Sequence, residues 1–357
     1  MANRLSSEHP QTLPFRTIKK GLQTFLLFTI LGMTLAYIWK TPANLQLILE
    51  KMEIRWLWLV LPLLALDFLL GGLRYRLFFD GKILPHISLW DCMRSNWANM
   101  FMGVVTPFQT GGGAAQMYIL WRCGATLAQG ALVSLINFAA TLLFFQIAAL
   151  LAYWILPGNL FGEHFTPVLQ TGFMVVAGVT ALVCSILGFP GFGLQLLQRL
   201  ARILPHRPAR LKQAALRLSE GLSHQIQDFG EDFSQILKQK KMTLLWTAIA
   251  TNALFFNKYI IGYVLARALF PDVPFGSFIG IQILQLFLIY FAPTPGASGI
   301  AEFSSTWLMS TLLPEQILLV FTVAWRFFTT FFAAILGAVV LLLDIRKLGG
   351  LRGSYFP

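Results

Sequence analysis

The sequence predicts an all-α polytopic membrane protein with six full transmembrane helices and two opposed re-entrant broken-helix units, arranged as an inverted-topology repeat. Composition is the first observation, because 56% of the 357 residues are hydrophobic and only 12% are charged. That charged fraction is about half of what a soluble domain carries. The second observation is a Gly/Pro break inside apolar sequence in each half, at Thr106–Gly113 and Pro293–Gly299. Such paired interruptions indicate a substrate site within the membrane.

Six apolar segments are long enough to cross a bilayer, which takes about 20 residues of helix. They are Gly21–Trp39, Trp56–Leu73, Leu127–Leu156, Val168–Leu187, Met242–Leu269 and Gln316–Leu343. The two broken units are Asp91–Trp121 and Phe275–Leu313. Irregular backbone at membrane depth is tolerated only where it is buried in protein or lines a wet cavity. We therefore expect both breaks to lie inside the protein.

The distribution of Lys and Arg predicts the orientation. Both chain ends and the loop 189–241 are rich in these residues, whereas 157–167 and 270–274 contain none. The positive-inside rule therefore places both termini and that loop in the cytoplasm. Six crossings satisfy these assignments, so the first broken unit enters from the cytoplasm and the second from outside.

The chain is thus predicted to be a single membrane domain, 1–357, with repeat halves 56–156 and 242–343. The cytoplasmic loop shows helical apolar spacing at Phe192–Leu204 and Leu211–Ile236. This spacing favours amphipathic helices on the inner leaflet.

Ionisable residues at membrane depth are the candidates for function. They are Asp67, Arg94, Lys258, Glu302 and Arg326. Cations outnumber carboxylates in this set, which favours an anion such as a phosphate, and the helix N-termini after each glycine cluster would add N–H donors. The predicted substrate-binding residues are Arg94, Asn99, Thr106, Pro107, Gln109, Gly111, Gly112, Lys258, Pro295, Gly296, Gly299, Glu302 and Arg326. Glu302 and Asp67 are the predicted coupling or counter-ion groups.

Structural alternatives exist for several of these residues. Glu302 and Arg326 could form a buried ion pair that locks two helices, and Asp67 could hydrogen-bond to Asn96 or Asn99. The glycines 111–113 could serve close helix packing. We further expect Arg74 and Arg76 to be interfacial anchors whose side chains reach the lipid headgroups.

Other function classes lack support in the sequence. The three cysteines and five histidines form no ligand pattern, so we expect no metal and no cofactor. The net charge of +12 is concentrated in the loops, which favours anionic lipid headgroups over nucleic acid as partners. No Walker-type phosphate loop is present, which argues against intrinsic ATP hydrolysis.

Two motifs carry a resemblance to a known family. The stretch Asn96–Leu120 looks like the first signature of the lysylphosphatidylglycerol synthase transmembrane family, the flippase-like domain, and Pro293–Glu302 resembles its second signature. Arg74 and Arg326 also fit, and the resemblance covers nearly the whole chain. It implies a bacterial or archaeal inner-membrane protein that translocates a lipid with a polar headgroup. The chain departs from the family pattern at Gly112-Gly113-Ala114, where many members carry an acidic residue.

Family members with a soluble aminoacyl-transferase domain also make lysyl-phosphatidylglycerol. We expect this chain to be a stand-alone member and not an enzyme, because no such domain follows the last span. The expected substrate is a phospholipid or polyprenyl-phosphate lipid, and a homodimer is a possible assembly. The alternatives are a secondary transporter of a small anionic solute, an intramembrane lipid-modifying enzyme, and a helper subunit whose breaks pack against a partner.

Overall fold

The computed structural model describes residues 52–155, 165–189, 226–290 and 292–353, together with the single positions 23, 27, 30, 31 and 34. Side chains at 153, 165–172 and 345–353 are not described. The five single positions are helical and belong to the predicted span Gly21–Trp39, whose other residues lie outside the described part. The same holds for the predicted helix Phe192–Leu204 and for most of Leu211–Ile236, of which residues 226–236 are helical.

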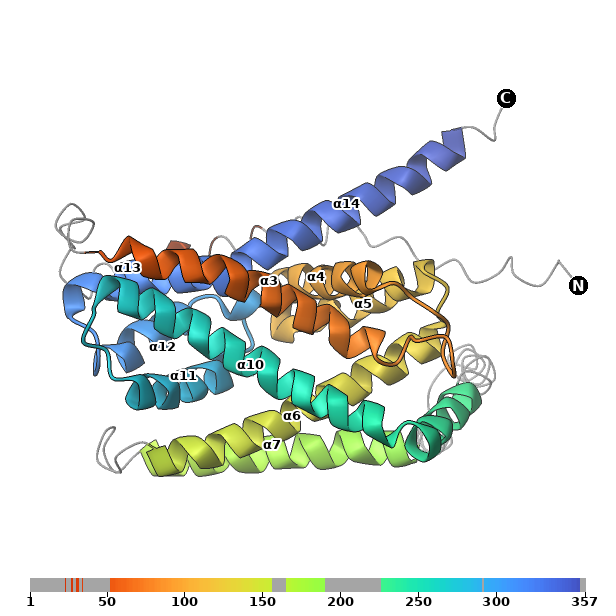
Figure 1. Cartoon of the computed structure of the whole chain (residues 1–357), viewed down its shortest axis with the longest axis horizontal. Helices are drawn as coiled ribbons and strands as arrows, with labels where there is room; N and C mark the ends of the chain where they lie inside the picture. The colour runs from red at the N-terminus through yellow and green to blue at the C-terminus, as the bar shows by residue number, and fades with distance from the viewer. Residues whose placement is uncertain are drawn as a thin grey trace, which may run out of the picture.

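Four helical stretches are long and apolar enough to cross a membrane. Three are α3 (Ile54–Arg76), α6 (Leu127–Ile155) and α10 (Lys241–Leu269). In the fourth, α13 (Glu315–Arg326) continues through a π-helical turn at Phe327–Phe331 into α14 (Phe332–Gly353). A further apolar helix, α7 (Phe165–Gly188), packs along α6 (Figure 1). These helices cover five of the six predicted spans.

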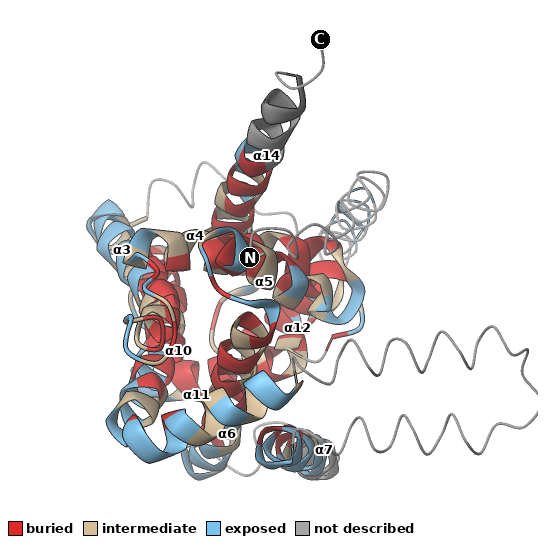
Figure 2. Cartoon of the chain, turned by 90° about the vertical axis from the view of Figure 1, so that its right-hand side faces the viewer, coloured by how far each residue is buried: buried red, intermediate tan, exposed pale blue. Residues whose placement is uncertain are grey.

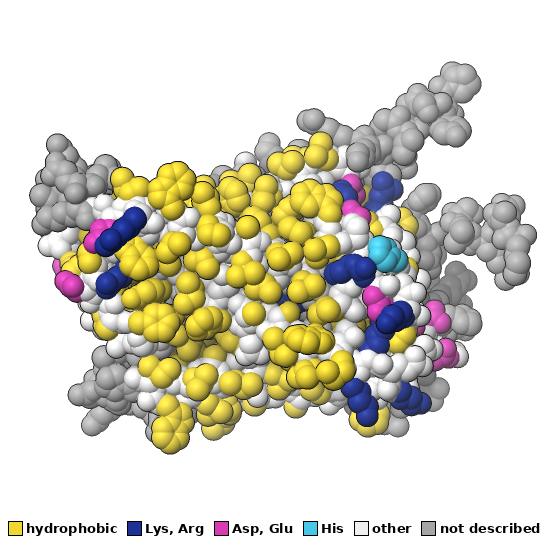
Figure 3. Space-filling view, viewed as in Figure 1, with side chains coloured by type: hydrophobic (Ala, Val, Ile, Leu, Met, Phe, Trp, Pro, Cys, Tyr) yellow, Lys and Arg dark blue, Asp and Glu magenta, His cyan; other side chains and the backbone are white. Residues whose placement is uncertain are grey.

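The surface supports membrane insertion. A broad apolar band covers one face of the molecule, and Lys, Arg, Asp and Glu side chains gather towards its two ends (Figure 3). A bilayer imposes this pattern, because its hydrocarbon core excludes charge and its headgroup regions accept it. Together with the four long apolar helices, this surface identifies a multi-pass membrane protein.

Each broken unit is a helical hairpin. The first consists of α4 (Leu89–Val105) and α5 (Gly111–Arg122), and the second of α11 (Phe275–Tyr290) and α12 (Ile300–Met309). The two hairpins extend from opposite ends of the molecule, and their tips meet in the middle (Figure 1). At that point the backbone N–H of Phe108 donates to the carbonyl oxygen of Pro293 at 3.4 Å.

Close helix packing holds the hairpins in place. In Figure 2 buried residues gather in α10, α11 and α12, whereas exposed residues lie mainly on the outer sides of α3, α6 and α7. Gly337 of α14 lies directly against the backbone of Trp97 in α4, where any side chain would collide. Between the halves, the ring of Phe144 in α6 stacks on that of Phe255 in α10 with centroids 4.7 Å apart. Small residues and aromatic contacts thus set the distances between helices.

Candidate functional site

The two breaks share the backbone conformation of their first four residues and diverge at the fifth, where Thr110 is helical and Ser298 is extended. In each, an extended Thr precedes a Pro, and two residues with left-handed φ follow. These two residues are Phe108 (φ 50°) and Gln109 (φ 56°) in the first break, and Gly296 (φ 56°) and Ala297 (φ 57°) in the second. Both breaks fit the pattern Thr-Pro-x-x-Thr/Ser-Gly, at 106–111 and 294–299. This match was not predicted above, and placing the two Thr-Pro pairs in register reveals it.

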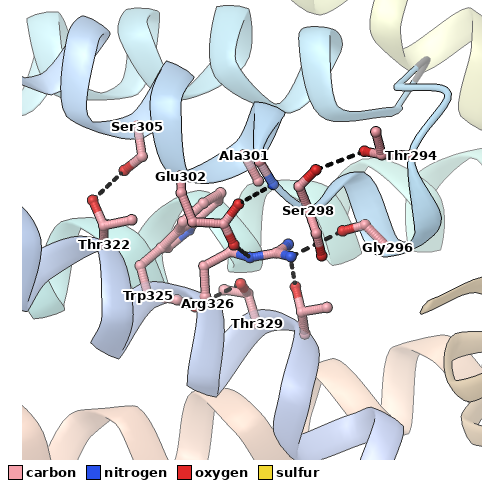
Figure 4. Close-up of polar contacts among 12 residues, drawn as sticks. Thr294, Gly296, Ser298, Ala301, Glu302, Ser305, Thr322, Trp325, Arg326 and Thr329 are labelled. Carbon is pink, nitrogen blue, oxygen red and sulfur yellow. Dashed lines mark hydrogen bonds and ion pairs between the residues drawn. The ribbon is translucent and has the colours of Figure 1, made fainter. Parts of the chain in front are cut away.

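A buried ion pair fixes the second break (Figure 4). Arg326 Nε donates to Glu302 Oε1 at 3.0 Å, and its Nη2 donates to the carbonyl oxygen of Gly296 at 2.9 Å. The other carboxylate oxygen of Glu302 accepts the N–H of Gly299 at 2.6 Å. Arg326 and Glu302 are 1% and 0% exposed. The structural alternative for this pair is therefore realised, since it joins α12 to α13 and binds the backbone on both sides of Ala297.

The first break is more open. Pro107 and Thr110 are exposed, and Phe108 is 64% exposed at the hairpin tip. Thr106 closes the turn, because its hydroxyl accepts the N–H of Gly111 at 2.9 Å and donates to the carbonyl oxygen of Met102 at 2.6 Å. The left-handed φ of Phe108 is unusual for a bulky residue. The tip that carries this strain is also the most exposed part of the hairpin.

The glycines that open α5 differ in their surroundings. A Cβ on Gly111 or Gly112 would collide with Thr106 or Asn99, whereas one on Gly113 would meet nothing within 4 Å. Ala114 occupies the position that Glu302 has in the second break, three residues after the last glycine of the shared pattern. The first turn of α5 therefore contains no acidic residue, and its N–H groups are a suitable binding place for an anion.

The predicted cations do not share one site. Lys258 in α10 pairs with Asp67 in α3 at 2.8 Å. Arg94 pairs with Asp91 at 2.8 Å and with Asp344 at 2.9 Å. Asp344 follows Arg326 by 18 residues along one continuous helical run, which is about 27 Å at 1.5 Å per residue. The structure therefore places Arg94, Lys258 and Arg326 in three separate ion pairs.

The prediction that Arg74 reaches the headgroups as an interfacial anchor is wrong. Its side chain is 8% exposed and turns into the protein, where it donates to Asn137 Oδ1 at 3.0 Å, to the carbonyl oxygen of Asn137 at 2.7 Å and to Thr141 Oγ1 at 2.9 Å. These acceptors lie one turn apart on α6, which packs against the end of α3. Arg76 keeps a more peripheral position and donates to the carbonyl oxygen of Phe79 at 2.7 Å.

A hydrogen-bond chain connects the surroundings of Arg74 to the first break. The hydroxyl of Tyr75 and the amide of Asn99 both donate to Gln116 Oε1, at 3.0 and 2.7 Å. Asn99 in turn packs directly on Gly112 at the start of α5. The sequence prediction named Asn99 and missed Tyr75 and Gln116, because their meeting depends on how α3 and α5 pack on α4.

An apolar cavity of about 590 Å³ adjoins the second break. It lies between α7, α11 and α12, and its lining includes Val175, Phe287, Pro293, Gly299, Phe303 and Trp307. Phe303 and Trp307 are 58% and 40% exposed, so the cavity opens towards the lipid-facing surface. An apolar pocket at this position suits a hydrocarbon chain and offers little to a charged solute.

Comparison with known proteins agrees with the architecture. Residues 25–337 match the family described as the lysylphosphatidylglycerol synthase TM region. A protein of Archaeoglobus fulgidus, described as a UPF0104 membrane protein, is 25% identical over 288 residues, which are 80% of this chain and 85% of the relative. The match spans both hairpins, both Thr-Pro breaks and the Glu302–Arg326 pair. The chain therefore belongs to the lysylphosphatidylglycerol synthase TM region family.

Proposed function

We propose that this protein translocates a lipid with a polar, phosphate-containing headgroup across the cytoplasmic membrane of a bacterium or archaeon. The observation that carries the proposal is the meeting of two hairpin tips from opposite ends of the molecule, through Phe108 and Pro293. Non-helical backbone at membrane depth must be buried in protein or line a wet cavity, and paired interruptions in the two halves of a transporter point to its substrate site. The family relationship supports the same function.

The proposed topology has six crossings and an inverted repeat. Arg76, Lys82 and Lys240 lie near the end at which the first hairpin begins, so that end faces the cytoplasm by the positive-inside rule. The first hairpin then re-enters from the cytoplasm and the second from outside. The shared Thr-Pro-x-x-Thr/Ser-Gly turns support the repeat, because they occur at the tips of oppositely directed hairpins.

In this mechanism the two breaks have different tasks. The headgroup passes along the exposed first tip, where the N-terminus of α5 offers backbone N–H donors to a phosphate. The second break forms a fixed wall, since Glu302 and Arg326 hold Gly299 and Gly296 in place. Glu302 and Arg326 are thus proposed to hold the second break in position. The coupling roles of Glu302 and Asp67 stay predictions.

The apolar cavity favours a lipid over a small anionic solute. A translocated lipid needs an apolar surface for its acyl chains beside the path of its headgroup. The cavity lined by Pro293, Phe303 and Trp307 provides such a surface next to the second break. Transport of a free anion would not use this surface.

The test is a flipping assay in liposomes that contain the purified protein. Labelled phosphatidylglycerol, aminoacylated phosphatidylglycerol and a polyprenyl phosphate are offered in parallel. Gly113→Leu fills the open space at the start of α5 and should slow translocation at least about tenfold, a barrier increase of about 1.4 kcal/mol. Gly178→Leu is the matched control, because this exposed glycine of α7 also has nothing within 4 Å of its Cβ position.

Four outcomes would contradict the proposal. Lipid movement no faster than in empty vesicles would remove the translocase function. Uptake of a soluble anion without lipid movement would favour the solute transporter, and recovery of a chemically altered lipid would favour an enzyme. Equal rates in Gly113→Leu and Gly178→Leu would place the pathway elsewhere.

A further inference from the structure

Charge balance distinguishes one buried cation from the others. Among the described residues, four largely buried cations have a carboxylate partner: Arg326 with Glu302, Lys258 with Asp67, Lys240 with Asp80, and Arg94 with Asp91 and Asp344. Arg74 is the exception, since no described carboxylate lies within ion-pair distance of it. Burying a charge without a counter-charge is costly, so the imbalance requires an explanation.

The neighbours of Arg74 supply only neutral oxygen atoms. Its three hydrogen bonds end on Asn137 and Thr141 of α6. The other groups with which it interacts electrostatically are the hydroxyls of Tyr75 and Tyr290, the latter at the end of α11. Elements of both repeat halves therefore surround a positive charge that they do not neutralise.

A second observation indicates unused donor capacity at Gln116, the hydrogen-bond partner of Tyr75. Gln116 is completely buried, and its Oε1 already accepts from Tyr75 and Asn99. Its Nε2, which can donate two hydrogen bonds, has no partner among the described residues. A buried amide donor without a partner is destabilising. Tyr75, with which Arg74 interacts electrostatically, thus links an unbalanced guanidinium to an unpartnered amide donor, and both kinds of group bind anions.

We propose that Arg74 is the centre of an anion site that takes the phosphate of the translocated lipid headgroup. Gln116 and Tyr75 contribute to this site, and Asn99 connects it to Gly112 at the first break. A guanidinium can bind two phosphate oxygens side by side, so phosphate oxygens replace the neutral acceptors Asn137 and Thr141. The assignment of a lipid rests on the proposed function, whereas the anion site rests on the geometry.

Asn137→Asp is the discriminating variant. It places a carboxylate where the amide oxygen now accepts from Arg74 Nε at 3.0 Å, with almost no change of shape. The variant supplies an internal counter-ion that competes with phosphate, so the site should be lost while the protein stays folded. Arg55→Gln is the control for charge, because Arg55 is exposed and pairs with Glu53.

Binding is measured with the full chain in neutral detergent, from the shift of the thermal midpoint on titration. The probes are phosphatidylglycerol, a diacylglycerol that lacks phosphate, and glycerol phosphate. Phosphatidylglycerol should bind the wild type and Arg55→Gln at least about tenfold more tightly than Asn137→Asp. Diacylglycerol should not distinguish these proteins. Equal stabilisation by glycerol phosphate and phosphatidylglycerol would overturn the assignment of a lipid and leave a site for soluble phosphate.

Two results would overturn the site itself. One is a wild type that does not prefer phosphatidylglycerol to diacylglycerol, and the other is wild-type affinity in Asn137→Asp. If Asn137→Asp does not fold, Gln116→Glu takes its place, because it replaces the unpartnered amide by a carboxylate. Gln116→Glu is expected to weaken the binding of phosphatidylglycerol. Wild-type affinity in this variant would also overturn the site. Binding is measured without movement. A failed flipping assay together with phosphatidylglycerol binding that Asn137→Asp weakens would therefore contradict only the translocation.

Discussion

The two breaks share the backbone conformation of their first four residues and differ in what surrounds it. Both use a Thr-Pro turn with two left-handed residues, at 107–109 and 295–297. The second is buried and held by Glu302 and Arg326, whereas the first has exposed residues at its tip and Ala114 at the position of the glutamate. One turn thus serves once as a fixed element and once as an accessible one. Three residues beyond the last glycine of the shared pattern, a single position decides whether a carboxylate is present.

The two buried arginines, Arg326 and Arg74, also differ in whether a carboxylate accompanies them. Arg326 neutralises Glu302 within the second half, and Arg74 of the first half has no described carboxylate partner. A membrane protein can retain an unpaired buried charge where a ligand of opposite charge is bound. Under the proposal above, Arg326 serves stability and Arg74 serves binding.

Removing the cation of the Glu302–Arg326 pair should have the largest effect on stability. Arg326→Gln leaves Glu302 buried without its cation and is expected to cost about 3–5 kcal/mol of unfolding free energy. Arg74→Gln should cost less, because it leaves no carboxylate unpaired. Thermal unfolding in detergent measures both, and Glu302→Gln combined with Arg326→Gln should cost less than the sum of the single changes. Equal losses for Arg74→Gln and Arg326→Gln would remove the distinction between the two arginines.

Substitutions at the left-handed positions 296 and 108 should change the unfolding free energy in opposite directions. Gly296→Ala puts a Cβ at φ 56° and is expected to cost about 1–2 kcal/mol. Phe108→Gly relieves about 1–2 kcal/mol of strain at φ 50° and loses about 0.5–1 kcal/mol to the greater freedom of glycine in the unfolded chain, so the unfolding free energy should rise by about 1 kcal/mol or less. The same thermal assay measures both changes. Destabilisation by Phe108→Gly would mean that contacts of this largely exposed ring outweigh the strain of its backbone.

A carboxylate introduced into the first break, at the position equivalent to Glu302, should have the smallest effect on stability. Ala114→Glu gives the first turn of α5 the acidic residue that Glu302 gives α12, and this should add about 0.3–1 kcal/mol through the helix N-terminus. The same charge repels a phosphate from these N–H groups, so lipid translocation should slow. Ala114→Gln is the matched neutral control. Equal flipping rates in the two variants would show that no anion approaches the start of α5.

Several features of the fold followed from local sequence. The bounds of α6 and α10 agree with the predicted spans within one residue, because apolar length alone decides whether a helix can cross the bilayer. Both breaks lie where Pro and Gly interrupt the apolar sequence. The pair Glu302–Arg326 was also named, since ionisable residues at membrane depth are few.

The partners of the charged residues could not be predicted in the same way. Arg94 pairs with Asp344 across 250 positions, and Lys258 pairs with Asp67 across 191 positions. Such contacts depend on which helices become neighbours and at what height, and no local pattern encodes this. For the same reason Arg74 was assigned to the membrane surface, although α6 offers it acceptors inside the protein.

The sequence by itself determined the membrane class, the five described spans and the positions of the two breaks, because the bilayer acts on each segment separately through length and polarity. Tertiary structure decided which break is closed and which of the two buried arginines, Arg74 and Arg326, lacks a described carboxylate partner. Those properties arise between segments, where Arg326 meets Glu302 and where Arg74 meets the neutral oxygens of α6. Burial makes the presence or absence of one carboxylate decisive, since a charge inside protein is not screened by water.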